Sequence, residues 1–267
     1  MMTNDEIADA ARRLDEAERT RRQIPLLSLQ YPAMNMADAY AVQRAWIELK
    51  IAAGRRIRGH KIGLTSKAMQ SALNIDIPDS GVLLDDMFFA DGASIATDKF
   101  IGLRIEAEVA FVLKSPLRGP HCTMFDVLNA TDFVVPALEI LDTRILRVDP
   151  QTKKTRNVCD TIADNAANCG IVMGGRPIRP DDCDLRWIGA IVSKNGAVEE
   201  TGLAAGVLNH PANGVAWLAN RMAAHGGALA AGEVVLAGSF IRPIEAGKGD
   251  TFVADYGPFG SVSCHFS

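Results

Sequence analysis

The chain has 267 residues, 48% of them hydrophobic and 22% charged, and its formal net charge at pH 7 is −4. This balance, without a long basic block, excludes nucleic acid as the main partner, and no run reaches the roughly 18–20 apolar residues that cross a membrane. Positions 1–22 are charged throughout and the five cysteines form no CxxC pair, so we expect no secretory signal, no disulfide framework and a cytoplasmic location.

Two amphipathic helices are predicted at the beginning of the chain. The first covers residues 4–22, where Thr3 and Glu6 have the spacing of a capping box. The second covers about 37–53 and is followed by a glycine and two arginines, which is typical of a helix C-terminus. We therefore expect residues 1–58 to form a helical N-terminal region.

Short β-type runs separated by Gly, Pro and Asp turns fill most of the remaining chain. They are not each followed by a helix, which disfavours a doubly wound parallel sheet and favours an α+β fold. Two helices interrupt them, one at about 161–169 with Asp160 as its N-cap, and one that starts at 209–211 with Asn209 as its cap and Pro211 in its first turn. We expect one integrated β-rich catalytic domain over 59–267, with strands at 59–64, 81–84, 104–113, 133–141, 188–194, 233–236, 251–256 and 261–266.

Acidic residues within two apolar runs are the clearest chemical signal. Glu106 and Glu108 lie on the predicted strand 104–113, where alternate side chains share a face and their Cα atoms should be about 6.5–7 Å apart. Glu139 lies alone in the apolar run 133–141. Three carboxylates without a histidine cluster suit a hard cation such as Mg²⁺ or Mn²⁺. The alternative is a charged, solvent-exposed face on an edge strand, and the residue pattern alone is compatible with both.

Lys61 stands between two glycines at the head of a predicted strand. A lysine beside a metal-bound substrate could have a lowered pKa and transfer protons near neutral pH, whereas the alternative is a surface lysine at a strand edge. The segment 78–81, which contains Asp79, is predicted as a turn.

Five stretches, in this order, resemble the hydratase/decarboxylase branch of the fumarylacetoacetate hydrolase superfamily. The resemblance runs through nearly the whole chain, from the first helix to Asp255-Tyr256-Gly257. The stretches are GHKIGLTSKAMQ (59–70), RIEAE (104–108), PALE (136–139), IADNAAN (162–168) and NHPAN (209–213).

The resemblance implies a fumarylacetoacetate-hydrolase-like mixed β-sandwich or roll with a helical N-terminal part. It implies that Glu106, Glu108 and Glu139 bind Mg²⁺, with Mn²⁺ as an alternative, and that Lys61 and Asp79 are catalytic. It also places Thr161 near the substrate. The hydrolase branch usually has an aspartate as its third ligand, so the glutamate at position 139 favours a hydratase or decarboxylase.

Within the family, the nearest resemblance is to hydratases of homoprotocatechuate (4-hydroxyphenylacetate) catabolism. It implies addition of water to 2-oxohept-4-ene-1,7-dioate, giving 4-hydroxy-2-oxoheptane-1,7-dioate. Alternatives are hydration of 2-hydroxypentadienoate, decarboxylation of 4-oxalocrotonate and acylpyruvate-type hydrolysis. The family also implies a homo-oligomer, a decamer built as a pentamer of dimers, with association to a companion decarboxylase as a further option. Cations that could bind the distal carboxylate of the substrate are Lys153, Lys154, Arg156 and Arg242.

Overall fold

The computed structural model describes residues 1–66, 70 and 77–267. Lys67, Ala68 and Met69 of the 59–70 motif lie outside the described residues. Three N-terminal helices come first: α1 (Asn4–Thr20), α2 (Leu27–Gln30) and α3 (Met36–Ala52). The predicted capping box of α1 is confirmed, because Thr3 and Glu6 exchange hydrogen bonds between side chain and backbone.

The larger sheet carries most of the apolar runs predicted as strands. Among the described residues it has eight strands in the order β2-β1-β10-β5-β6-β7-β3, with β11 paired to β5. Its strands are β1 (Ile57–Gly63), β2 (Asp79–Leu84), β3 (Phe88–Phe89), β5 (Arg104–Leu113), β6 (Thr131–Leu141), β7 (Asn168–Met173), β10 (Val234–Leu236) and β11 (Ile244–Glu245).

A smaller sheet packs against one face of the larger one. In the described part of the chain it has five strands, β4 (Ala93–Ile95), β13 (Ser261–Phe266), β12 (Thr251–Asp255), β8 (Gly189–Lys194) and β9 (Ala197–Leu203), in that order. Alternate residues of β5, such as Ile105 and Val109, join Phe252 and Phe266 in the main hydrophobic core. The other face of β5 therefore remains for the acidic residues.

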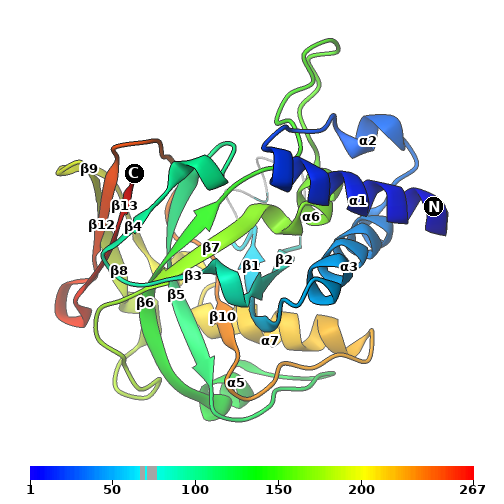
Figure 1. The fold of residues 1–267 in the computed structure, drawn as a ribbon. Helices are drawn as coiled ribbons and strands as arrows, with labels where there is room; N and C mark the ends of the chain where they lie inside the picture. Colours follow the sequence, from blue (N-terminus) through cyan, green and yellow to red (C-terminus); the bar gives the residue numbers. More distant parts are fainter. Residues whose placement is uncertain (67–69, 71–76) are drawn as a thin grey trace.

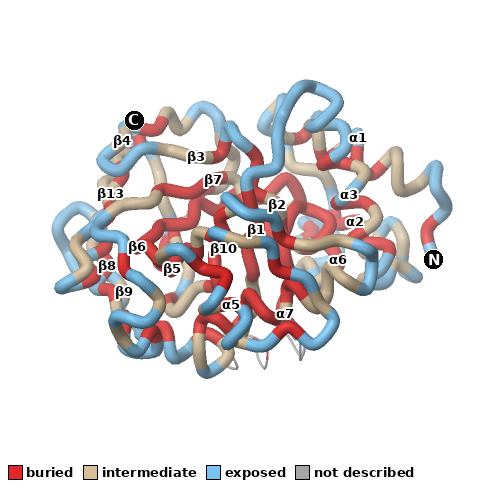
Figure 2. The backbone as a smooth tube through the Cα atoms, turned by 90° about the horizontal axis from the view of Figure 1, so that it is seen from below, coloured by how far each residue is buried: buried red, intermediate tan, exposed pale blue. Residues whose placement is uncertain are grey.

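Helices enclose the remaining sides of the large sheet (Figure 1). The helices α5 (Met124–Ala130) and α7 (Pro211–Ala223) lie together at one end, and α6 (Val158–Ala163) packs against α3 and α2. A second core, which includes Leu14, Trp46 and Ile162, joins α1 and α3 to α6. Figure 2 shows that buried stretches gather in the middle of the molecule, while exposed stretches lie mostly at its outside. The division at residue 58 into a helical region and a β-rich domain stays a prediction.

The structure also has short 3₁₀ segments at Asp85–Met87, Thr97–Lys99, Asn165–Ala167 (η3), Leu185–Trp187, Ala204–Gly206 and Gly257–Phe259. Within the described residues, none of the helices combines the length and apolar character needed to cross a membrane. The α+β fold predicted from the sequence is confirmed.

Three local predictions are wrong. The segment 161–169 is not one helix: α6 ends at Ala163 and 168–173 is strand β7, because three residues in the left-handed region interrupt the helix. The cap of α6 is Asn157, and Asp160 completes its capping box from the third helical position instead of capping a helix itself. The predicted turn at 78–81 is largely strand, because Asp79 pairs with β1.

The cap of α7 also differs from the prediction. His210 holds this position, and its Nδ1 accepts a hydrogen bond from the N–H of Ala212. Asn209 instead has a φ of +67°, a left-handed conformation that asparagine tolerates well. Pro211 is the first helical residue, as predicted.

Candidate metal centre

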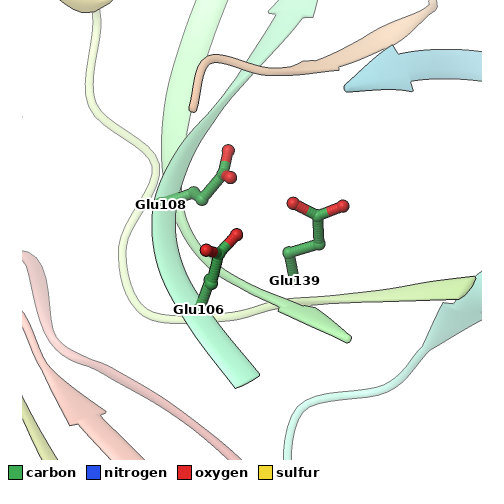
Figure 3. A group of neighbouring side chains, drawn as sticks. All are labelled: Glu106, Glu108 and Glu139. Carbon is green, nitrogen blue, oxygen red and sulfur yellow. The ribbon is translucent and has the colours of Figure 1, made fainter. Parts of the chain in front are cut away.

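Strands β5 and β6 bring the three predicted glutamates together. The two strands are antiparallel neighbours, and their register places Glu106 directly opposite Glu139 and Glu108 opposite Ala137. Residues that lie opposite one another across a ladder point to the same face of the sheet, so the three side chains converge, as Figure 3 shows. One carboxylate oxygen from each residue lies within 4.8 Å of the others.

The convergence of these carboxylates concentrates negative charge in a buried place. Glu108 and Glu139 are fully buried. Burial, followed by the charge of Glu139, raises the pKa of Glu106 to about 8, and the same two causes raise the pKa of Glu108 well above its ordinary value. The alternative of a solvent-exposed edge-strand face is therefore wrong, since β5 lies between β10 and β6.

The free oxygens of the buried glutamates fit a cation. A hydrogen bond from the N–H of Gly238 holds Glu108 Oε2 (2.8 Å), and the amide of Asn168 holds Glu139 Oε1 (2.7 Å). The other oxygens, Glu108 Oε1 and Glu139 Oε2, are buried without a hydrogen-bond partner in the described part of the chain. Buried acceptors without a donor are costly, and an oxygen-only donor set suits Mg²⁺ or a similar hard cation.

Lys61 is buried beside these carboxylates. It lies on β1 between β2 and β10, is 3% exposed, and has its Nζ 3.4 Å from Glu139 Oε1 and 3.0 Å from the carbonyl oxygen of Ala166, to which it donates. The surface-lysine alternative is therefore wrong. Burial acts to lower the pKa of Lys61, but the charges of the neighbouring carboxylates outweigh it, Glu139 first, and the net direction is upward. The expectation of a lowered pKa is corrected accordingly.

Asp79 lies opposite Gly63 in the register of β2 with β1. It is 1% exposed, its Oδ1 lacks a hydrogen-bond partner among the described residues, and burial raises its pKa although Lys61 acts in the opposite direction. The close approach explains the glycine: a Cβ at position 63 would lie 2.3 Å from Asp79 Oδ1 and 3.1 Å from Lys61 Nζ. The structure thus places both predicted catalytic residues beside the glutamates.

A left-handed turn at residues 165–167 holds this arrangement in place. Asn165, Ala166 and Ala167 have φ values of 53°, 52° and 60°, a conformation that costs free energy in residues other than glycine. The side chain of Asn165 fixes the turn against β2 by bonding both the N–H (2.7 Å) and the carbonyl (2.9 Å) of Val82. The turn aims the Ala166 carbonyl at Lys61.

Asn168 follows this turn, and sequence reasoning gave it no role. The residue lies in the 162–168 motif, so a signal existed, but its contact with Glu139 depends on the pairing of β6 with β7. Thr161 lies on α6, where its hydroxyl donates to the carbonyl of Asn157 (3.4 Å), and no described hydrogen bond links it to the glutamates. A substrate contact by Thr161 stays a prediction.

A hollow of about 350 Å³ opens beside Glu106, with Gly63, Ser239 and Arg242 also in its lining. The cationic residues predicted to bind a distal carboxylate differ in their exposure to solvent. Lys153 and Lys154 are exposed residues in the turn of a hairpin, whereas Arg156 is half-buried at its base.

No family model matches the chain, but individual relatives do. It is 62% identical to the 2-oxo-hept-4-ene-1,7-dioate hydratase of Escherichia coli, over 96% of each chain. It is 41% identical to the 2-hydroxyhexa-2,4-dienoate hydratase of Comamonas testosteroni, over 98% of this chain and 97% of the relative. Among solved structures, the 4-oxalocrotonate decarboxylase of Pseudomonas putida G7, complexed with magnesium and adipate, superposes with a TM-score of 0.94 at 35% identity, covering 100% of this chain and 99% of the other.

Proposed function

Because the chain belongs to the hydratase/decarboxylase branch of the fumarylacetoacetate hydrolase superfamily, we propose that it is a Mg²⁺-dependent hydratase of 2-oxohept-4-ene-1,7-dioate in homoprotocatechuate (4-hydroxyphenylacetate) catabolism. The product is 4-hydroxy-2-oxoheptane-1,7-dioate. The observation that carries the proposal is the convergence of Glu106, Glu108 and Glu139 around buried, unpaired oxygens, in a chain so similar to the E. coli hydratase.

The three glutamates are the proposed ligands of the magnesium ion. When bound there, the ion supplies Lewis-acid stabilisation for the negative charge that develops on the 2-oxo group as the substrate enolises. The remaining oxygens of Glu108 and Glu139 are already engaged by Gly238 and Asn168, which fixes the orientation of both carboxylates before any ligand arrives.

Lys61 is the proposed proton carrier. Its Nζ lies 3.4 Å from Glu139 Oε1, and its contact with the Ala166 carbonyl fixes the direction of its stem. In the proposed reaction C3 of the substrate loses a proton and C5 gains one, which moves the double bond from C4–C5 to C3–C4. Lys61 delivers a proton to the carbon skeleton during this shift.

Asp79 is the proposed partner in water addition. Its unpaired Oδ1 can accept a hydrogen bond from a water molecule, and its raised pKa favours proton uptake from that water. Water adds at C4 while C3 regains a proton, so the net reaction consumes one water molecule and releases nothing.

The runner-up activity is decarboxylation of 4-oxalocrotonate, which the overall likeness to the Pseudomonas putida decarboxylase favours. Both reactions pass through an enolate, so the three glutamates suit both. Hydration of 2-hydroxypentadienoate is a further alternative. An acylpyruvate-type hydrolase fits less well, because Glu139 stands where that branch usually has aspartate.

The test compares 2-hydroxydienoates with and without a distal carboxylate, each assayed with Mg²⁺ and with EDTA. We expect loss of dienol absorbance without CO₂ release, preference for the seven-carbon dioate and inactivation by EDTA. Release of CO₂ from 2-oxohex-3-enedioate would identify the decarboxylase instead, and full activity after complete metal removal would refute the role of the glutamates.

We also propose a cytoplasmic homo-oligomer, a decamer of five dimers, with association to a companion decarboxylase as an option. The free cysteines favour a reducing compartment. Exposed apolar side chains on and beside β8 and β9, Trp187, Ile191, Val198 and Leu203, favour self-association. Light scattering on the purified protein measures the oligomer, and copurification with a second chain tests the partner.

A further inference from the structure

Three arginines, at positions 104, 147 and 156, lie close enough to affect one another's pKa, and the first of them lies on the strand that carries Glu106 and Glu108. Arg104 lies two residues from Glu106 on β5, so the two side chains share a face. Arg147 and Arg156 form the base of a hairpin: the N–H of Arg156 donates to the carbonyl of Arg147 (2.9 Å), and Val148 pairs with Thr155 just beyond.

Two of these guanidinium groups have no counterion among the residues that the structure describes. Arg104 pairs with Glu245 at 2.8 Å. Arg147 donates to the carbonyl of Gly102 (3.3 Å) and Arg156 to the hydroxyl of Thr143 (2.7 Å), and within the described residues neither forms an ion pair.

The two carboxylates that act most strongly on the pKa of Arg156 are engaged by other groups. Asp164 binds Arg144, and Asp160 accepts hydrogen bonds from the backbone and hydroxyl of Ser28. Each guanidinium carries five N–H donors. Several donors of Arg147 and Arg156 therefore remain for a ligand.

The electrostatics agree with a site built for an anion. Burial first, and then the charges of Arg104 and Arg156, lower the pKa of Arg147 to about 10. Burial also lowers the pKa of Arg156, with Arg104 among the further causes. Half-buried like charges that repel one another are stabilised by an anion, as the converging glutamates are by a cation.

Two of the arginines lie within electrostatic reach of the reacting groups. Arg156 acts on the pKa of Asp79, and Arg104 acts on that of Glu106. Arg104 and Arg147 also line a hollow of about 380 Å³, which contains Glu245 and Lys248 as well.

We propose that Arg147 and Arg156, together with Arg104, bind the distal carboxylate of the substrate and so select dicarboxylic over monocarboxylic 2-oxo acids. The inference rests on the proposed function for the glutamate end of the site. Planar guanidinium forks are suited to bidentate recognition of a carboxylate.

Arg242 is the competing candidate, since it lines the hollow beside Glu106. Its side chain, however, is 81% exposed and already paired with Glu200. A solvated, neutralised arginine contributes little to binding, whereas a half-buried guanidinium without a counterion contributes more. The sequence left these candidates equal, and the structure favours Arg156 and adds Arg147.

The experiment compares R147Q, R156Q and the matched control R242Q on two substrates of equal length, 2-hydroxyhepta-2,4-diene-1,7-dioate and 2-hydroxyhepta-2,4-dienoate. For R147Q we expect kcat/KM on the dioate to fall by about ten- to a hundredfold, with kcat/KM on the monoacid unchanged. For R156Q, whose loss also affects Asp79, we expect a larger fall on the dioate than on the monoacid. R147K should recover part of the loss, because it retains the charge without the fork. Equal losses on both substrates, or a dioate-selective loss in R242Q alone, would overturn the proposal.

A binding measurement separates this proposal from the proposed function. Calorimetry with Mg²⁺ and either adipate or hexanoate requires no turnover. We expect the unaltered protein to bind adipate more tightly than hexanoate and R147Q to lose that difference. If no dienoate is hydrated but the difference is present and lost in R147Q, the reaction is wrong and the anion site is right. Equal binding of adipate and hexanoate by the unaltered protein contradicts the anion site.

Discussion

Replacement of Arg144 by methionine is expected to destabilise the protein and impair the site through one buried ion pair. Arg144 is 1% exposed, lies 2.5 Å from Asp164 and 5.0 Å from the ring of Trp46, and donates to the backbone carbonyls of Asp164 (2.8 Å) and Asn168 (3.2 Å). It therefore ties the N-terminal helices to the two ends of the left-handed turn.

The expected loss in free energy of unfolding is about 3–5 kcal/mol, the usual cost of removing one partner of a buried ion pair. The reason is that Asp164 stays buried in R144M without its guanidinium partner. The double variant R144M/D164N removes this unpaired charge while keeping a carbonyl acceptor for Thr143, which donates to Asp164 at 3.1 Å. We therefore expect the double variant to be about 1–3 kcal/mol more stable than R144M.

Urea unfolding of both variants and the unaltered protein measures these differences. Activity at a temperature where R144M stays folded provides the functional readout: kcat should fall, since the turn positions the acceptor of Lys61 and the amide that holds Glu139. A loss below about 1 kcal/mol in R144M, or a double variant no more stable than the single one, would refute the ion-pair argument.

Four further outcomes are expected. K61A should lose about 10²–10⁴-fold in turnover yet bind Mn²⁺ by calorimetry, and wild-type rates would remove Lys61 from the mechanism. E139Q should bind Mg²⁺ more weakly in the same titration, and unchanged affinity would exclude Glu139 as a ligand. The pKa of Glu106 is raised to about 8, so the metal-free folded state binds more protons than the unfolded chain between about pH 4.5 and 8. The melting temperature of the metal-free protein should therefore fall as the pH rises through that window, and it should fall less in E106Q. A melting temperature that does not change with pH would contradict this. G63A should reduce both stability and kcat because its methyl group would meet Asp79 Oδ1, whereas G206A, with nothing near its Cβ position, should be neutral; similar behaviour of the two would count against the close approach.

The strands that carry the glutamates were predictable because their signal is local. Strand β5 has the predicted bounds, and β6 begins two residues earlier than predicted. Period-two alternation gave the shared face of Glu106 and Glu108. The position of Glu139 directly opposite Glu106 depends on the register between two strands, which one sequence does not specify.

Features that depend on tertiary contacts escaped prediction. The two alanines after Asn165 do not signal a left-handed turn, since alanine normally favours a helix. The contacts of Asn165 with β2 and of Asp164 with Arg144 impose it. The sequence predicted a turn at Asp79, because its place in a strand depends on pairing with β1. Arg104 is far in the sequence from Arg147 and Arg156, and their approach depends on how the hairpin that carries the latter two packs beside β5.

The left-handed turn has a consequence for mutational scanning. Lys61 donates to a main-chain carbonyl, and a main-chain acceptor survives every side-chain substitution. Positions 166 and 167 are alanine already, so an alanine scan passes over the segment that orients the lysine. A valine scan would report on it instead, because β-branched side chains tolerate positive φ poorly. Loss of activity on substitution of these two small residues would identify a part of the active site that acts through its main chain.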